Sequence, residues 1–162
     1  MSLAIKQSSQ ALLSCMEQVM MEWAFLSLDY LGEPGQKPAR LPLERRIRLQ
    51  GPQSRACMVV RGSFGLGLGV ARSVRGLPSS NLPAGEASFV ELCGLIAEEW
   101  RRREQAMGQG DWSCGKVEAS NPDQWPTGPA DAAVVATVRG LAIEVLLWSE
   151  AQGGSQALRA TA

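Results

Sequence analysis

Hydrophobic and polar residues follow two different periods along the chain, and the longer period marks its helices. In residues 3–23 and 84–107 an apolar side chain recurs about every third or fourth position. This spacing predicts two long amphipathic helices. The apolar stripe of the second one consists of Phe89, Leu92, Cys93, Ile96 and Trp100. We expect a third, shorter helix over residues 66–75.

The shorter period and the apolar runs mark strands. Residues 45–50 and 56–60 flank a turn at Gly51 and Pro52, and residues 132–138 and 141–148 flank Arg139 and Gly140. Each pair predicts a β-hairpin. Short strands are also expected over 24–30 and 116–119. These elements predict an α+β fold in which long helices pack on a mainly antiparallel sheet.

Breaks rich in proline and glycine connect these elements, at residues 32–42, 76–83 and 122–129. The length of 162 residues suits one domain. We therefore expect a single domain over residues 1–150 and a disordered tail over 151–162.

Charge and hydropathy restrict the partners and the location. Sixteen basic and sixteen acidic side chains cancel, so no overall field attracts the protein to nucleic acid or to an anionic membrane. No stretch reaches the roughly 18 apolar residues of a membrane span, and the N-terminus lacks the pattern of a secretory signal. We expect a cytoplasmic protein that recognises its partner locally.

The content of histidine and cysteine excludes several kinds of chemistry. Histidine is absent, which removes Ser-His-Asp and Cys-His catalysis and imidazole metal sites. The four cysteines are far apart in sequence and form no CxxC pair. We interpret Cys15, Cys57, Cys93 and Cys114 as reduced, mostly buried thiols, and expect neither a metal nor a cofactor.

A glycine-rich run over residues 62–69 lies between a predicted strand and a predicted helix. Counted from Gly65, its spacing does not match the dinucleotide-binding GxGxxG motif, and it lacks the GKS or GKT ending of a P-loop. We interpret the glycines as places where a strand passes into a closely packed helix, and not as a phosphate loop.

The long helix over 84–107 carries the most informative positions. Ala87, Glu91, Gly94 and Glu98 are spaced by four, three and four residues, which places them on one face, away from the apolar stripe. An exposed row on a rigid helix suits contact with a partner's active site.

This helix resembles the signature helix of the CheC/CheX chemotaxis phosphatases, which carries Asp or Ser, three residues, Glu, two residues, then Asn. Glu91 matches the Glu, whereas Ala87 and Gly94 occupy the other two signature positions and Ser88 lies one place out of register. The long N-terminal helix, the strand-to-helix passage and the closing hairpin extend the resemblance over about residues 1–150.

The resemblance implies a function and a set of site residues. In the family, the Glu engages an active-site lysine of a phosphorylated response regulator, and the Asn amide orients the water that attacks the aspartyl phosphate. Glu91 is then the catalytic candidate, and the partner-binding candidates are Ala87, Ser88, Gly94 and Glu98. Glycine supplies no amide, and loss of one preorganised polar group lowers a rate by about 10²–10³. We expect binding to a CheY-like receiver domain with weak or absent phosphatase activity.

Several alternatives stay open. Glu91 also fits an ordinary solvated glutamate, Glu98 fits an ion pair with Arg101 or Arg102, and Gly94 fits close approach by either a partner or a neighbouring element. A substitute amide is available in Asn81, Asn121 or Gln124. The alternative function is a non-enzymatic adaptor or homodimerisation module in a bacterial signalling or motility pathway, acting through sheet edges and through Trp112 and Trp125.

Overall fold

The computed structural model describes residues 3–32, 41–76, 82–108 and 110–151. The described helices are α1 (Leu3–Ala24), α2 (Phe64–Arg75) and α3 (Leu82–Ala106), with a short 3-10 helix η1 at Pro122–Gln124. The described strands are β1 (Tyr30–Gly32), β2 (Leu43–Gln50), β3 (Ser54–Gly62), β4 (Ser113–Ala119), β5 (Ala132–Val138) and β6 (Leu141–Ala151).

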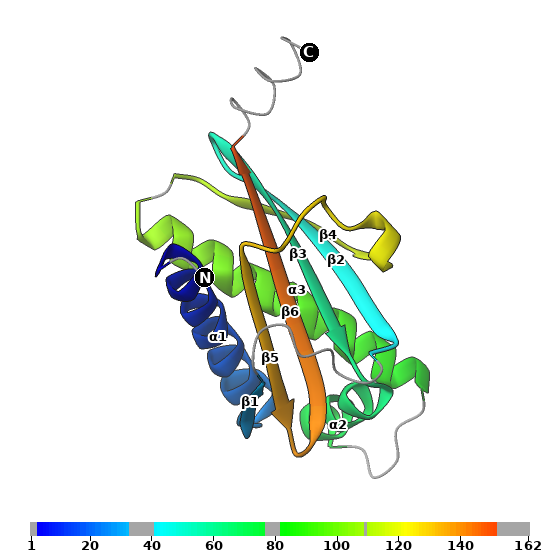
Figure 1. The fold of residues 1–162 in the computed structure, drawn as a ribbon. Helices are drawn as coiled ribbons and strands as arrows, with labels where there is room; N and C mark the ends of the chain where they lie inside the picture. Colours follow the sequence, from blue (N-terminus) through cyan, green and yellow to red (C-terminus); the bar gives the residue numbers. More distant parts are fainter. Residues whose placement is uncertain (1–2, 33–40, 77–81, 109, 152–162) are drawn as a thin grey trace.

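The strands form one antiparallel sheet in the order β1-β5-β6-β3-β2-β4. Helices α1 and α3 lie along one face of this sheet, and α2 lies at one end (Figure 1). The predicted α+β fold and both predicted hairpins are therefore confirmed. At the β5–β6 turn, Arg139 and Gly140 both have positive φ, at 51° and 78°, which is the backbone that a two-residue hairpin turn requires.

The main core lies between the sheet and the helices. Alternate residues of β2 and β3 face the helices, because side chains of a strand point to opposite faces in turn. Ile47, Met58 and Val60 are buried there against Met16 of α1 and Phe89 of α3. The apolar stripe predicted for the second long helix is thus the part of α3 that packs on the sheet.

Close contacts explain the glycine-rich run. A Cβ atom on Gly67 would lie 2.8 Å from the carbonyl oxygen of Gly85, so α2 and α3 touch through their backbones at this point. A Cβ atom on Gly62 would lie 2.9 Å from the ring of Phe89. The interpretation as a closely packed strand-to-helix passage is confirmed, and Ser63 caps α2 by accepting a hydrogen bond from the Leu66 backbone N–H.

The prediction of a strand over 24–30 was wrong for most of its length. Helix α1 continues to Ala24, Phe25 takes a positive φ of 57°, and β1 starts only at Tyr30. Leu26 donates its backbone N–H to the Met20 carbonyl, which ends the helix. The alternating pattern belongs to an extended segment that buries Leu26 over the core.

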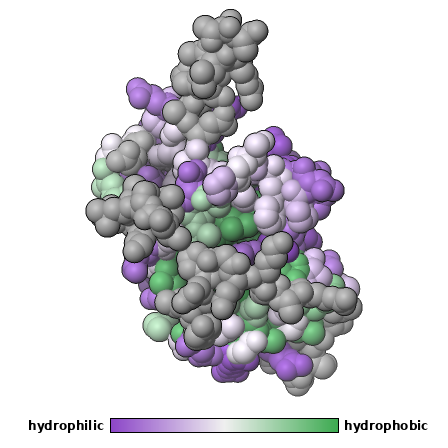
Figure 2. All heavy atoms as spheres, viewed as in Figure 1, coloured by the Kyte–Doolittle hydropathy of each residue, from purple (hydrophilic) through white to green (hydrophobic). Residues whose placement is uncertain are grey.

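None of the described α-helices lies on the other face of the sheet. Val59, Leu146 and Trp148 are buried there, and Trp125 from the segment between β4 and β5 packs against them. In the space-filling view of this face, apolar surface lies at the centre beside hydrophilic side chains (Figure 2).

An ion-pair network ties that segment to the sheet. Arg61 lies 2.8 Å from Glu144 and 3.1 Å from Glu44, and its guanidinium lies 5.3 Å from the centre of the Trp125 ring. The Trp125 indole N–H donates to the second oxygen of Glu44 at 3.0 Å. The buried carboxylate of Glu44 thus has two partners from different elements.

Some predictions fall outside the described residues. These are the 151–162 tail beyond Ala151 and most of the 32–42 and 76–83 connectors. Among the described helices, none has the length and apolar composition needed to cross a membrane.

Candidate functional site

Helix α3 presents the predicted row at the surface, with one exception. Ala87 and Glu91 are exposed, and Gly94 and Glu98 are partly exposed. Ser88 is fully buried on another side of the helix. The prediction that Ser88 contributes to the partner-binding surface is wrong, because its side chain points inward. We call Ala87, Glu91, Gly94 and Glu98 the α3 row.

Packing fixes the orientation of α3. Phe89, Cys93 and Ile96 are fully buried against the sheet. Near the C-terminal end, the rings of Trp100 and Trp112 meet edge to face with centroids 5.1 Å apart, a favourable aromatic geometry. Because these residues hold one side of the helix against β2 and β4, the α3 row is turned outward beside the edge strand β4.

Gly94 lies opposite Val117 of β4. A Cβ atom built on Gly94 would lie 3.6 Å from a Val117 methyl group, which is ordinary van der Waals contact. The fold itself therefore has room for a side chain at this position. Of the two explanations for Gly94, close approach by a neighbouring element of the same chain is not required.

Glu98 belongs to a small polar cluster. Arg101 donates to its carboxylate through Nε at 2.9 Å and also through Nη2, as the ion-pair alternative anticipated. This hydrogen bond is the main reason why the pKa of Glu98 lies below its usual range, and the Cys114 thiol adds a second hydrogen bond. Burial, with Glu98 as a further cause, raises the pKa of Cys114 to about 11, so Cys114 stays a neutral thiol.

Sequence reasoning missed Leu95 as part of this surface. Leu95 is 36% exposed, and it was not among the candidate site residues. Leu95 lies four residues after Glu91, so the two side chains are neighbours on the helix surface. This i, i+4 spacing was the available signal. The α3 row thus combines two carboxylates and two small residues, with an apolar side chain beside it.

Two of the candidate substitute amides have other surroundings in the structure. Asn121 caps η1, where its side chain accepts a hydrogen bond from the Asp123 backbone N–H. Gln124 lines a groove on the helix-free face of the sheet. Asn81 lies outside the described residues.

Of the two tryptophans proposed for the alternative function, Trp112 is buried and Trp125 is partly buried. Trp112 is 9% exposed and contacts Trp100, and Trp125 packs on Trp148 with ring centroids 5.6 Å apart. Within the described ranges, no three His, Cys, Asp or Glu side chains are grouped so that they would hold a metal ion.

The order of elements, the antiparallel sheet and the outward row on α3 define a class of fold. It is the fold of the CheC and CheX chemotaxis proteins, and the resemblance stated from the sequence is confirmed at this level. No protein-family model and no curated protein matches the chain in sequence.

Several solved structures of chemotaxis proteins are similar to this chain in fold. The chemotaxis protein CheX from Vibrio vulnificus has a TM-score of 0.70 and 16% identity, covering 92% of this chain and 100% of that one. CheX in a CheX-CheY-BeF3-Mg complex from Borrelia burgdorferi has a TM-score of 0.66 and 14% identity, with 87% and 96% covered. A CheC-like superfamily protein from Shewanella has a TM-score of 0.60 and 14% identity, with 91% and 99% covered.

Proposed function

We propose that this protein is a chemotaxis-type signalling domain that binds the phosphorylated receiver domain of a CheY-like response regulator. The observation that carries the proposal is the outward α3 row centred on Glu91, on the helix where the signature motif of this fold lies. One of the similar structures is a complex of CheX with CheY. Such a partner implies a cytoplasmic location, and no cofactor is needed.

In the proposed complex, Glu91 contacts a cationic side chain of the receiver. Ala87 and Gly94 leave space beside it, and Leu95 adds an apolar contact. Glu98 is already hydrogen bonded to Arg101 and Cys114, so we assign it to the margin of the interface, where ion pairs contribute little to binding. Ser88 has no part in this surface.

Phosphatase activity is weak or absent in this proposal. The attacking water needs an oriented polar group, and Gly94 has no side chain to provide one. The Asn121 side chain caps η1, and Gln124 lines the groove on the other face of the sheet. The domain would then act mainly by holding the phosphorylated receiver.

Two substitutions on one helix test binding. Isothermal titration of the domain with a receiver phosphorylated by a small-molecule phosphodonor should detect a complex. We expect Glu91→Ala to weaken it at least tenfold, since a charged contact at the centre of an interface is lost. Glu86→Ala removes an exposed carboxylate of the same helix outside the row and should leave the affinity unchanged. Absence of any complex, or equal effects of the two substitutions, contradicts the proposal.

Restoring the missing amide tests the catalytic part. Gly94→Asn should raise the rate of phosphate release from the receiver by about 10²-fold, whereas Gly94→Ala should not. A rapid release by the unmodified domain would show that another group orients the water.

The alternative, a non-enzymatic adaptor or homodimer, relies on a different feature. Strand β4 is an edge of the sheet, and no described strand pairs with its outer side. Light scattering distinguishes the two functions. A stable dimer that ignores phosphorylated receivers favours the alternative, and a monomer that binds them favours the leading proposal.

A further inference from the structure

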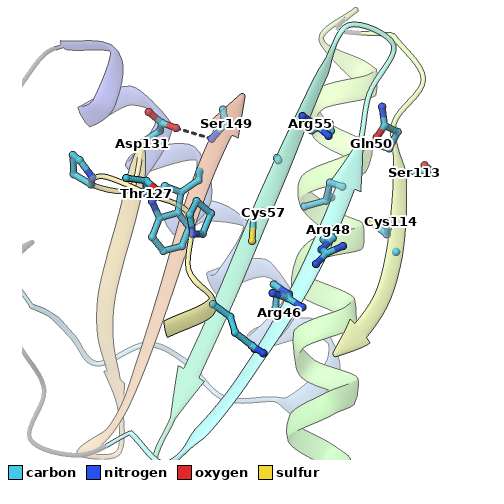
Figure 3. A pocket seen from close by; sticks show the side chains of 17 residues that line it. Arg46, Arg48, Gln50, Arg55, Cys57, Ser113, Cys114, Thr127, Asp131 and Ser149 are labelled. Atoms are coloured by element: carbon cyan, nitrogen blue, oxygen red, sulfur yellow. Dashed lines mark hydrogen bonds between the residues drawn. The ribbon is translucent and has the colours of Figure 1, made fainter. Parts of the chain in front are cut away.

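A groove lies on the helix-free face of the sheet, on the opposite side from α3. It has a volume of about 1020 Å³. Strands β2, β3 and β6 form its floor, β4 borders it, and the segment between η1 and β5 forms the facing wall (Figure 3). The function proposed above does not use this groove.

The register of the strands arranges the floor. Arg48 pairs with Cys57 across β2 and β3, and Cys57 pairs with Trp148 across β3 and β6. These three side chains therefore form one line across the groove, with a cation at one end and an indole at the other. Arg46 lies two residues before Arg48 on the same face of β2, which separates their Cα atoms by about 6.7 Å.

The two arginines have hydrogen-bonding capacity to spare. Nη2 of Arg46 lies 2.8 Å from Glu118, while its Nε is buried and has no hydrogen-bond partner among the described residues. Arg48 is exposed, and no described carboxylate lies within ion-pair distance of it. Burial raises the pKa of Cys57, and the nearby charges of Arg46 and Arg48 both oppose that shift.

The facing wall combines prolines with polar residues and is held in place by hydrogen bonds. Pro126 and Pro129 line it, and the Trp148 indole N–H donates to the Gly128 carbonyl at 3.1 Å. Asp131, the one acidic residue among the described lining residues, accepts a hydrogen bond from the Ser149 backbone N–H at 2.6 Å. Its carboxylate is thereby turned to the strand and leaves the cationic side dominant (Figure 3).

We propose that this groove binds a phosphate-bearing small molecule of nucleotide size, with its phosphates on Arg46 and Arg48 and its organic part against Trp148 and the prolines. Guanidinium groups match phosphate oxygens in geometry and charge. The volume corresponds to the upper end of small-molecule sites, which are apolar with a few placed polar groups. The site is separate from the glycine-rich run, whose glycines serve helix packing.

Calorimetry with three probes at low ionic strength tests the proposal. ADP and inorganic pyrophosphate should bind, and adenosine should not, because the phosphate supplies the recognition. Arg48→Gln should weaken ADP binding at least tenfold, and Arg48→Lys should weaken it less, since the charge remains. Arg72→Gln is the matched control, because Arg72 is an exposed arginine of α2 at the far end of the sheet.

A second readout locates the ligand. Cys57 lies in the floor between the arginines and the tryptophan, so bound ADP should slow its alkylation, as followed by mass spectrometry of the peptides. Tighter binding of ADP than of pyrophosphate supports the proposal, because the organic part then adds to the binding. It is overturned if neither probe binds at millimolar concentration, if pyrophosphate binds as tightly as ADP or more tightly, or if Arg48→Gln binds ADP as the unmodified protein does.

Discussion

The α3 row and the groove lie on opposite sides of one sheet and have opposite chemistry. The row presents carboxylates among small side chains on a single helix, whereas the groove gathers arginines, a tryptophan and prolines from several elements. Sixteen positive and sixteen negative side chains cancel over the whole chain. A net charge of zero therefore conceals two local surfaces of opposite charge, which would attract different partners.

The largest expected loss of stability comes from a substitution in the core between α3 and the sheet. Phe89→Ala should lower the free energy of unfolding by about 3–5 kcal/mol, because it leaves a cavity between α3 and the sheet. Phe89 is fully buried, and its ring packs close to Gly62 at the end of β3. Urea unfolding measures the change, with Glu86→Ala as a surface control. A loss below 1 kcal/mol would mean that α3 is not anchored there.

Arg61→Met should affect ligand binding in the groove but not receiver binding at the α3 row. It leaves the carboxylates of Glu44 and Glu144 without their cation, at a cost of about 3 kcal/mol. The contact of Arg61 with Trp125 is lost as well. We expect weaker ADP binding in the groove and unchanged receiver binding at 15 °C, where the variant is still folded. If receiver binding falls to the same extent as ADP binding, the two surfaces are not independent. Circular dichroism checks the folded fraction.

Gly94→Ala should stabilise the protein by up to about 1 kcal/mol. Glycine in a helix interior is less favourable than alanine by about this amount, and the added methyl group has room beside Val117. Urea unfolding measures the gain. A destabilised variant would show that β4 needs the space at Gly94.

The smallest effect is expected at Glu98. Because the pKa of Glu98 is lowered in the folded protein, its stabilising contribution is present above the unfolded pKa of about 4.3 and is lost as the pH falls through the lowered folded value. Glu98→Gln should therefore cost less than about 0.5 kcal/mol at pH 7, since the pair is solvent exposed. The difference in stability between the two proteins should shrink as the pH falls through the lowered pKa of Glu98. A difference that grows toward low pH would contradict this assignment.

Local patterns were sufficient to predict most of the fold. Helices α1 and α3 are marked by apolar spacing, and the β5–β6 turn is marked by Arg139 and Gly140. Each of these patterns involves residues close together in the sequence, so it can be recognised without knowledge of the fold. The segment after Ala24 shows the limit. Leu26 is buried through an extended segment that has no strand partner until Tyr30, and alternation alone does not distinguish such a segment from a strand.

The surfaces were predictable to different extents. The α3 row lies on one helix, so helical geometry identified it, but Ser88 lies near the border between the exposed and buried sides and was assigned to the wrong one. The groove combines Arg48, Cys57 and Trp148, which are brought together only by strand pairing. The sequence contains no local pattern that joins them.

The contact between Gly67 and Gly85 determines the orientation of helix α3. Helix α3 is a rigid rod held near its far end by the Trp100–Trp112 pair, and the two glycines set how closely its first turns approach α2. A methyl group at either glycine would push the first turns of α3 away from α2. The outward surface around Ala87 would then tilt while the Trp100 end of the helix stayed in place. Two residues without side chains thus set the angle at which the helix meets a partner.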